Sequence, residues 1–275
     1  MDIRKLASPE EYLDAERLQR AVWNFPDREI IPLNELVALQ KHGGHVFGAF
    51  DGKVLAAFCF GMPAFRDGKA YHYSRMLGVL PGRQDSGLGY AMKLKQREYV
   101  LRQGLDRVVW TFDPLQSRNA YLNIEKLGCV IREYLVNLYP ASGSRFNEGL
   151  ESDRFTAEWW IASRRVKDSI AGRKRAYRLE DYAPAIETRV GEAGWREPAS
   201  ARFPARARKA SIEIPDDIDA LKKDDLPLAQ RWREATREAF VSAFRKGFVA
   251  HGFLGIPEVG RRRSFYLLEK GYRVR

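Results

Sequence analysis

The sequence predicts an α/β protein in which a mixed β-sheet is flanked by helices and followed by a smaller C-terminal αβ lobe. Three observations predict this class. Apolar runs with strand character alternate along the chain with amphipathic helical segments. One strand, ending at Val79-Leu80-Pro81, leads through a glycine-rich turn into a helix. An Asp51-Gly52 turn between two apolar runs adds an antiparallel hairpin.

Helices and strands alternate most clearly in the first part of the chain. Pro9 follows Ser8 and fits the first turn of a helix, while Gly104 and Gly128 mark the ends of two later helices. We expect helices over 9–22, 33–41, 88–103 and 118–127, and strands over 45–50, 54–60, 71–80, 107–112, 130–139 and 155–161. The helix over 88–103 should bury Leu88, Ala91, Met92 and Tyr99.

The last third of the chain contains a second organised region. Residues 164–209 are charged and rich in Arg, Ala, Gly and Pro, and predict no clear element. Beyond them, a helix capped by Asp224 or Asp225 should end at Gly247. Its expected buried stripe is Leu228, Trp232, Ala235, Ala239, Phe240 and Ala243. Strands are expected over 211–214, 248–254 and 264–268. We therefore divide the chain into 1–163, 164–209 and 210–275.

Composition bounds the class of protein. The chain has 275 residues, 45% of them hydrophobic and 30% charged, which fits one large or two modest globular domains. No apolar run approaches the length of a membrane span, so we expect no membrane association. The start of the chain has no apolar signal core, and the two cysteines, Cys59 and Cys129, form no disulfide framework. We therefore expect a cytoplasmic protein with Cys59 in its core.

The formal net charge of +11 indicates anionic partners or substrates. Much of the excess lies in basic runs over 164–178, 202–209 and 261–263. These runs fit a solvated face, or less readily a nucleic-acid surface. Zinc-finger spacing, aromatic RNA-binding motifs and basic-zipper heptads are all missing from the sequence, which disfavours nucleic acid as a partner.

The glycine-rich turn has the properties of a phosphate-binding loop. It reads Gln84-Asp85-Ser86-Gly87-Leu88-Gly89-Tyr90. Small residues let several backbone N–H groups converge at the positive end of the following helix, where a pyrophosphate can bind. A purely structural turn is the simpler alternative. A dinucleotide fingerprint would need a third glycine at position 92, which is Met92, and the Gly-Lys-Ser/Thr of a P-loop is missing.

The order Gln-x-x-Gly-x-Gly after a strand ending in Val-Leu-Pro resembles the coenzyme A loop of the GNAT superfamily of N-acyltransferases. The resemblance implies a mixed sheet flanked by helices and an acyl-CoA co-substrate, with no metal. It also implies that Gln84 to Tyr90 hold the pyrophosphate. The strand edge formed by Leu77, Gly78 and Val79 would offer backbone N–H groups to the pantetheine and to the thioester oxygen.

A second segment resembles the same superfamily. Asn119-Ala120 lies at an expected strand-to-helix junction and is followed by Lys126-Leu127-Gly128. The resemblance implies that the Asn119 amide faces the pantetheine arm, although Asn119 could instead cap the helix. Segments over 74–123, 153–160 and 231–248 resemble a branch of large predicted acyltransferases. Some members are associated with N-succinylamino-acid metabolism, which implies an amino-acid or small amine acceptor and acetyl-CoA or succinyl-CoA as donor.

The residues for acid chemistry depart from the superfamily pattern. Many members place a tyrosine two residues before the lysine of Lys-x-Gly, where its hydroxyl protonates the leaving thiolate. Here that position is Ile124, which cannot act as an acid. Tyr121, one helical turn earlier, is the candidate replacement, although a tyrosine on a short helix also fits simple packing.

Candidates for the base that deprotonates the amine are few. His72 precedes Ser74 by two positions on the strand before the loop, so both should face one side. Its unperturbed pKa suits base catalysis, but a partly buried strand histidine is the alternative. Asp113 and Glu125 are carboxylate alternatives, and Asp113 fits better as a local anchor of the loop after its strand. For a carboxylate on the substrate, the nearest candidates are Arg75, Arg118 and Arg132.

Three functions therefore stay open at this point: an N-acyltransferase, a degenerate member that binds acyl-CoA as a sensor, and a nucleic-acid-binding protein. The absence of tyrosine at position 124 keeps the second open. Members of the superfamily often dimerise, so a homodimer is also open.

Overall fold

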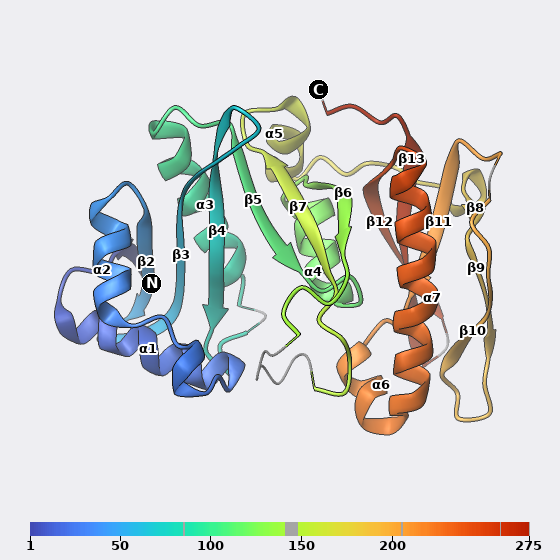
Figure 1. Cartoon of the computed structure of the whole chain (residues 1–275), viewed down its shortest axis with the longest axis horizontal. Helices are drawn as coiled ribbons and strands as arrows, with labels where there is room; N and C mark the ends of the chain where they lie inside the picture. Colours follow the sequence, from blue (N-terminus) through green and yellow to red (C-terminus); the bar gives the residue numbers. More distant parts are fainter. Residues whose placement is uncertain (85, 141–147, 205, 259, 275) are drawn as a thin grey trace. The chain divides into compact units, whose positions relative to one another are not determined.

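The computed structural model describes residues 1–84, 86–140, 148–204, 206–258 and 260–274 (Figure 1). The chain forms two compact units. Unit 1 contains Met1–Trp110, and unit 2 contains Thr111–Pro140 and Gly149–Arg275. The expected boundaries at residues 163 and 209 do not coincide with this division. The physical reason is that β6 (Val130–Leu135) pairs with β12 (Phe248–Glu258), so both strands belong to one unit.

Unit 1 is built around strands in the order β1-β2-β3-β4-β5. Its elements are β1 (Asp2–Lys5), α1 (Pro9–Trp23), a 3-10 turn (Asp27–Glu29), α2 (Leu33–Lys41), β2 (His45–Asp51), β3 (Val54–Arg66), β4 (Lys69–Val79), α3 (Leu88–Arg102) and β5 (Arg107–Phe112), whose last two residues fall in unit 2. Strands β1 to β4 pair antiparallel, whereas β4 and β5 pair parallel. The predicted mixed α/β class is confirmed.

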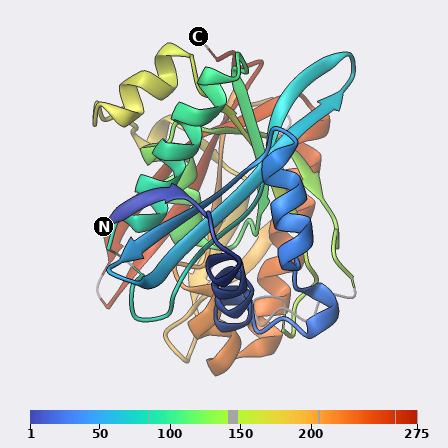
Figure 2. The ribbon, with the colours of Figure 1, turned by 90° about the vertical axis from the view of Figure 1, so that its left-hand side faces the viewer.

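Helices cover both faces of this sheet. Helices α1 and α2 pack on one face through a core that includes Leu18, Leu36 and Phe58, and α3 packs on the other face through Leu88 and Met92 (Figure 2). The α1 start follows the sequence expectation, since the Ser8 side chain caps it ahead of Pro9. The glycine-rich turn lies where β4 passes into α3.

Two features of β3 and β4 were not predicted. The strands continue past their expected ends and join at Asp67 and Gly68, both at positive φ. This second Asp-Gly turn carries the same signal as Asp51-Gly52. A β-bulge also interrupts β4, because Ser74 pairs with Gly61 and Met76 with Phe60, leaving Arg75 extra. The bulge reverses the alternation, so the Ser74 side chain faces α3 whereas Met76 faces α1.

The buried face of α3 differs from its prediction. Leu88 and Met92 are buried as expected, but Ala91 and Tyr99 are only half-buried. The buried positions instead include Lys93 and Gln96. The apolar pattern alone could not identify them, because these two polar side chains are held by polar partners on the sheet.

Unit 2 contains strands in the order β7-β6-β12-β13-β11-β8, with a separate β9-β10 hairpin. Its elements are α4 (Ser117–Ala120), a π-helical turn (Tyr121–Lys126), β6, β7 (Arg154–Trp160), α5 (Arg164–Ile170), a 3-10 turn (Leu179–Asp181), β8 (Ala183–Pro184), β9 (Ile186–Val190), β10 (Arg196–Ala201), β11 (Lys209–Ile214), α6 (Ile218–Asp224), α7 (Leu226–Arg245), β12 and β13 (Arg261–Lys270). The segment 164–209, which the sequence left unassigned, thus forms α5 and β8 to β10.

Helix α7 packs against the strands of unit 2. Asp225 caps it by accepting a hydrogen bond from the Leu228 N–H at 2.8 Å, and the helix packs along β6, β11 and β12 (Figure 1). The predicted stripe is buried except for the half-buried Ala235, and Arg233 and Thr236 are buried as well. Among the helices that the structure describes, none combines the length and apolarity needed to cross a membrane.

Candidate functional site

The turn between β4 and α3 is held by its own hydrogen bonds. The Leu80 N–H donates to Ala56 O at 2.9 Å, and the Arg83 N–H donates back to Leu80 O at 3.0 Å. The Ser86 hydroxyl donates to Arg83 O at 2.6 Å, so it closes the turn. The Arg83 side chain pairs with Asp51 at 2.8 Å, which ties the turn to the β2–β3 hairpin. These contacts hold Leu80, Arg83 and Ser86 in the turn. Asp85 lies outside the described residues.

The amino terminus of α3 is suited to bind an anion. Gly87 precedes it with φ +79°, a left-handed conformation that favours glycine, and provides no capping side chain. The backbone N–H groups of Leu88, Gly89 and Tyr90 belong to the first turn, so they have no intrahelical acceptor. The first turn carries no acidic residue that would compensate the helix dipole. Gln84 is exposed beside this turn.

The structure constrains the two glycines of this region, Gly78 and Gly89, differently. A Cβ on Gly78 would lie 2.7 Å from the Trp23 ring, so packing against α1 requires glycine there. A Cβ on Gly89 would lie 3.6 Å from Leu77 Cδ2, an ordinary contact, and Gly89 is helical. Alanine would therefore fit at position 89 and would favour the helix. Within the described residues, nothing in the fold requires glycine at position 89.

The edge of β4 next to this turn is open. Strands β4 and β5 pair only at His72–Val108 and Tyr73–Val109 within the described residues, so the β5-side edge of β4 beyond them has no strand partner. Because the Leu80 N–H points to β3 and backbone groups alternate, the N–H groups of Leu77 and Val79 point away from β3. An extended ligand could hydrogen-bond there. The backbone groups of Gly78 point toward β3.

His72 lies in the interior of unit 1. Its side chain faces the same side as Ser74, as predicted, and its ring stacks on His45 at 4.9 Å between centroids. Both ring nitrogens are buried, without a hydrogen-bond partner among the described residues. Desolvation, with a smaller contribution from the Lys93 ammonium, lowers the pKa of His72 to about 4. These properties favour the alternative of a buried strand histidine over a base.

A buried polar cluster fixes α3 on the sheet below the turn. The Lys93 ammonium donates to Ser74 Oγ at 2.9 Å and to Gln96 Oε1 at 3.1 Å, and it lies 3.6 Å from the centroid of the Trp110 ring. The Gln96 amide lies 3.1 Å from His45 Nε2. Buried polar groups that satisfy one another specify a single packing of a helix. This cluster could not be predicted from the sequence, because Lys and Gln on an amphipathic helix normally face solvent.

The second predicted motif lies in unit 2. Asn119 is exposed and sits third in α4, which begins after Gln116, so Asn119 is not the helix cap. Within the described residues, its amide makes no hydrogen bond. Tyr121 is 44% exposed on the π-helical turn, whereas Ile124 is fully buried. Position 124 is thus a core position, and Tyr121 is the accessible aromatic side chain of this turn.

The other candidate acids and arginines have structural partners. Asp113 accepts the expected local hydrogen bond from the Leu115 N–H at 2.8 Å and also pairs with the buried Arg233 at 2.7 Å. Burial acts to raise the pKa of Asp113, but the Arg233 guanidinium outweighs it and holds the pKa below its usual value. Glu125 accepts from the Phe253 N–H at 2.9 Å, and burial raises its pKa.

Of the three arginines proposed to hold a substrate carboxylate, Arg132 pairs with Glu158 instead. Arg75 is the extra residue of the β4 bulge, and Arg118 is exposed on α4. Within the described residues, no group of three or more His, Cys, Asp or Glu side chains is placed to hold a metal ion. Cys59 is buried, as predicted, and desolvation raises the pKa of its thiol to about 12.

Comparison with known proteins gives structural likenesses only. Neither a protein-family model nor a curated protein matches the chain. The chain is similar to the solved structure of an aminoglycoside 6'-N-acetyltransferase complexed with coenzyme A, with 16% identity over 60% of this chain and 99% of that chain and a TM-score of 0.46. It is also similar to an acetyltransferase of the GNAT family from Streptococcus pneumoniae, with 18% identity, coverage of 57% and 96%, and a TM-score of 0.45.

A third similar structure is FeeM, an N-acyl amino acid synthase from uncultured soil microbes, with 12% identity, coverage of 58% and 90%, and a TM-score of 0.44. Each comparison spans nearly the whole of the other chain but at most 60% of this one. We therefore base the function on the residues and geometry of this chain.

Proposed function

We propose that this protein is a GNAT-type N-acyltransferase that transfers an acyl group from acyl-CoA to a small amine or an amino acid. The observation that carries the proposal is the α3 amino terminus, where Gly87 and Gly89 leave the backbone N–H groups uncovered. These N–H groups and the helix dipole would bind the pyrophosphate of coenzyme A. Gln84, Ser86, Leu88 and Tyr90 complete the loop, and Asp85 stays a sequence prediction.

The open edge of β4 would hold the rest of the cofactor. The outward N–H groups of Leu77 and Val79 are oriented to bind the pantetheine amide and to stabilise negative charge on the thioester oxygen. The amine attacks the thioester carbonyl, a C–N bond forms, and the C–S bond breaks to release the coenzyme A thiolate. Gly78 contributes by letting α1 pack against β4.

The reaction also needs residues that accept and donate protons. The attacking amine must lose a proton to a base or to water, and the thiolate must gain one. Tyr121, which is 44% exposed, is the proposed acid, since Ile124 is buried and cannot act. Asn119 is exposed on the same helical turn and is proposed to contact the pantetheine. His72 stays a weaker candidate for the base because it is buried and because its pKa, lowered to about 4, makes it a weak proton acceptor.

The acyl donor, the acceptor and the location complete the proposal. Acetyl-CoA and succinyl-CoA are the candidate donors, an amine or amino acid is the acceptor, and the cytoplasm is the proposed compartment. A second function, an acyl-CoA sensor without turnover, is favoured by one observation, the fully buried Ile124 at the usual acid position.

The test is isothermal titration of the full chain with acetyl-CoA, succinyl-CoA and free coenzyme A. Gly87→Trp should weaken binding by about 100-fold or more, because the indole would occupy the pyrophosphate position. Gly68→Trp is the matched control, since Gly68 also has positive φ and a Cβ placed on it would have nothing within 4 Å. This control should bind like wild type. Equal binding by wild type and Gly87→Trp would overturn the site.

Release of free thiol then separates the enzyme from the sensor. Wild type incubated with the bound acyl-CoA and a panel of amines and amino acids should release coenzyme A faster than without acceptor. Tyr121→Phe should lower kcat with little change in binding. Tight binding without release for every acceptor would support the sensor. If none of acetyl-CoA, succinyl-CoA and free coenzyme A binds, the enzyme and the sensor proposals are both wrong. Salt-dependent nucleic-acid binding is then the property to measure.

A further inference from the structure

The three basic runs of the sequence differ in how far the fold pairs their charges. In the run over 164–178, Arg173 pairs with Asp168, and Arg178 pairs with Glu180 at 2.9 Å. All four side chains lie at the surface or close to it, where such pairs are common. This run therefore fits the solvated face that the sequence favours.

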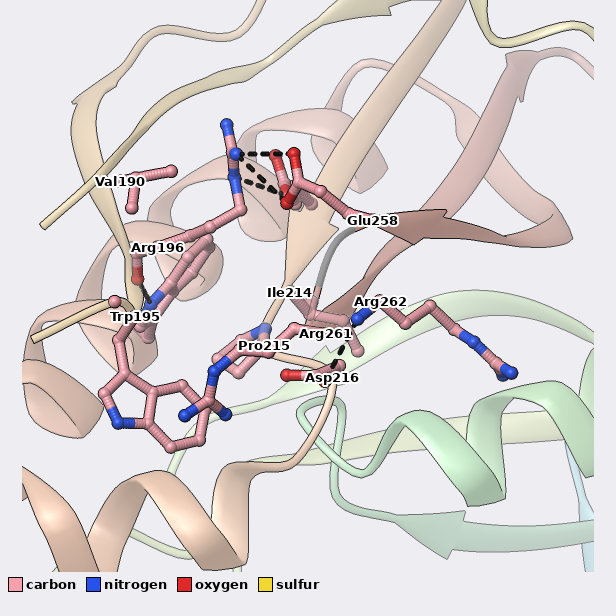
Figure 3. Close-up of a pocket in the computed structure, with 12 residues that line it drawn as sticks. Val190, Trp195, Arg196, Ile214, Pro215, Asp216, Glu258, Arg261 and Arg262 are labelled. Carbon is pink, nitrogen blue, oxygen red and sulfur yellow. Dashed lines mark hydrogen bonds and ion pairs between the residues drawn. The ribbon is translucent and has the colours of Figure 1, made fainter.

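The run over 261–263 lies beside a cavity of about 260 Å³ that is lined by residues of α7 and of β9 to β13 (Figure 3). Arg263 pairs at 2.7 Å with Glu213, which is 3% exposed. Arg196 pairs with the same carboxylate and with Glu258, both at 3.2 Å, and dashed lines in Figure 3 mark its contacts. Charges at this wall of the cavity are thus neutralised by one another.

The arginines of the run over 202–209 differ from both. Arg202, Arg206 and Arg208 are exposed. In the part of the chain that the structure describes, their side chains make neither a hydrogen bond nor an ion pair. Their guanidinium groups are therefore open to a partner outside the chain.

Two neighbouring segments of unit 2 add further cations. The Lys270 N–H donates to Arg208 O at 2.9 Å, so the end of β13 lies beside the start of β11. The Gly271 N–H donates to Gly247 O at 2.9 Å, so the residues that follow α7 lie on the other side of β13 (Figure 1). The exposed cations of these segments are Arg245, Lys246 and Lys270.

Aromatic packing holds the segment around Phe203 against the end of α7. The Phe203 and Phe248 rings pack edge to face with centroids 4.9 Å apart, and the Lys246 ammonium lies 5.0 Å from the centroid of the Phe203 ring. Three segments of the chain thus converge within unit 2. We call their exposed cations the basic surface, and none of these forms an ion pair within the described residues: Arg202, Arg206, Arg208, Arg245, Lys246 and Lys270.

The carboxylate next to this surface in β13 faces the other way. Glu269 precedes Lys270, and its carboxylate lies 3.7 Å from Nε2 of the buried His251. Because side chains alternate along a strand, Lys270 points to the opposite side of the sheet from Glu269. Arg208 borders an open cavity that Glu269 also lines, so Arg208 marks the edge of the basic surface.

The chemistry of the basic surface favours phosphate groups. Most of its members are arginines, whose planar guanidinium groups bind phosphate through paired hydrogen bonds. The large apolar side chains that the described residues expose, among them Phe65, Tyr121 and Val190, all lie outside it. A membrane surface would need such side chains to insert, and a single strand would need exposed aromatic rings for stacking. The backbone of a duplex needs cations only.

We propose that the basic surface of unit 2 binds a nucleic-acid duplex through its phosphate backbone, without reading the bases. Its cations replace counterions of the duplex, and release of these ions drives binding. The zinc-finger and basic-zipper patterns that the sequence lacks serve base readout, so their absence does not bear on phosphate contacts. The surface lies within unit 2 and does not depend on the proposed acyl-CoA binding.

The experiment is fluorescence anisotropy of the full chain with a labelled DNA duplex of about 20 bp. If about four of the six cations meet phosphates, raising the salt concentration from about 50 mM to about 200 mM should weaken binding by about 100-fold. Poly-L-glutamate of equal charge and vesicles that contain phosphatidylserine are the comparison probes. Each should bind at least about tenfold more weakly than the duplex.

A triple variant locates the site. Arg206→Gln combined with Lys246→Gln and Lys270→Gln should make the slope of log affinity against log salt shallower by about 2.7, because each lost phosphate contact contributes about 0.9. At about 50 mM salt it should weaken duplex binding by about tenfold or more. Its thermal midpoint verifies folding.

The control variant has the same loss of charge. Arg164→Gln combined with Arg173→Gln and Arg178→Gln removes three exposed arginines that are already ion-paired, so it should keep the wild-type slope. The proposal is overturned if the duplex fails to bind in the micromolar range at about 50 mM salt, or if the two triple variants bind it equally. Binding of poly-L-glutamate or of the vesicles as tight as that of the duplex would overturn it as well.

Discussion

The glycine-rich turn of unit 1 and the ion pairs around Glu213 in unit 2 place positive charge in different ways. At the turn, the charge comes from the backbone N–H groups at the start of α3, beside Gly87 and Gly89. At the wall of the unit 2 cavity lined by Arg196 and Glu213, it comes from the guanidinium groups of Arg196 and Arg263, which pair with the buried Glu213 carboxylate. A backbone site needs no buried ions, whereas a side-chain site needs its ions arranged and neutralised.

This difference predicts where each unit is most sensitive to substitution. Removing a charge from the wall of the cavity should cost stability, because its partners stay partly buried. Changing a small residue at the turn should cost binding but little stability.

Glu213→Gln should lower the free energy of unfolding by about 3 kcal/mol, because it leaves Arg196 and Arg263 without their shared carboxylate. Urea unfolding at neutral pH measures the change. Glu187→Gln is the control, since exposed Glu187 accepts a 3.3 Å hydrogen bond from Ser200 and makes no ion pair within the described residues, and it should change stability by less than about 0.5 kcal/mol. Equal stability of the two variants would contradict the importance of the paired wall.

His72→Gln tests the neutral interior below the turn. The pKa of His72 is about 4 in the folded protein and about 6.5 when unfolded, so the unfolded state binds the proton more readily. Its contribution to stability is fully present above about pH 6.5 and is lost as the pH falls toward 4. Between pH 7 and pH 5 this amounts to about 2 kcal/mol.

The measurement is the free energy of unfolding at both pH values. The loss on going from pH 7 to pH 5 should be about 2 kcal/mol smaller in His72→Gln than in wild type. His42→Gln changes an exposed histidine and should keep the wild-type loss. An unchanged loss in His72→Gln would mean that His72 is solvated, which would restore it as a candidate base.

Gly89→Ala should raise the free energy of unfolding by about 0.5 kcal/mol, because alanine favours the helix and its Cβ meets only Leu77 Cδ2 at 3.6 Å. Gly78→Ala is the contrasting variant, since its Cβ would lie 2.7 Å from the Trp23 ring, and it should lose stability. Thermal unfolding of both variants measures the expected gain in stability for Gly89→Ala and the expected loss for Gly78→Ala. Destabilisation by Gly89→Ala would indicate a structural reason for that glycine.

The two regions also differ in how far the sequence predicts them. The turn could be recognised because Gly87 and Gly89 are close together in the chain and their spacing after a strand has a direct physical meaning. The elements from α1 to α3 and the α7 cap, predicted at Asp224 or Asp225 and found at Asp225, followed from local patterns in the same way, whereas β1, α6 and the elements within 164–209 were not predicted. The cavity could not be predicted, because its lining comes from positions 190 to 262 and depends on strand pairing.

Buried polar contacts were also not predicted from the sequence. Lys93 and Gln96 have the composition of a solvent-facing helix surface, yet they are buried against Ser74 and His45. Arg233 likewise pairs with Asp113, which is 120 residues away in the chain. Such partners are set by tertiary packing, and the β4 bulge at Arg75 shows how one inserted residue redirects the strand faces. The sequence predicted that Asp113 holds the loop after its strand through a local side-chain hydrogen bond. The hydrogen bond from the Leu115 N–H to Asp113 confirms this local part of its role.

The most direct test of the central claim is the affinity of Gly89→Ala for free coenzyme A, measured by calorimetry beside its thermal midpoint. If the backbone at position 89 lies against the pyrophosphate, this variant should bind at least about tenfold more weakly while its thermal midpoint stays equal or rises. Wild-type affinity in Gly89→Ala would contradict the claim, because a methyl group there would then meet no ligand.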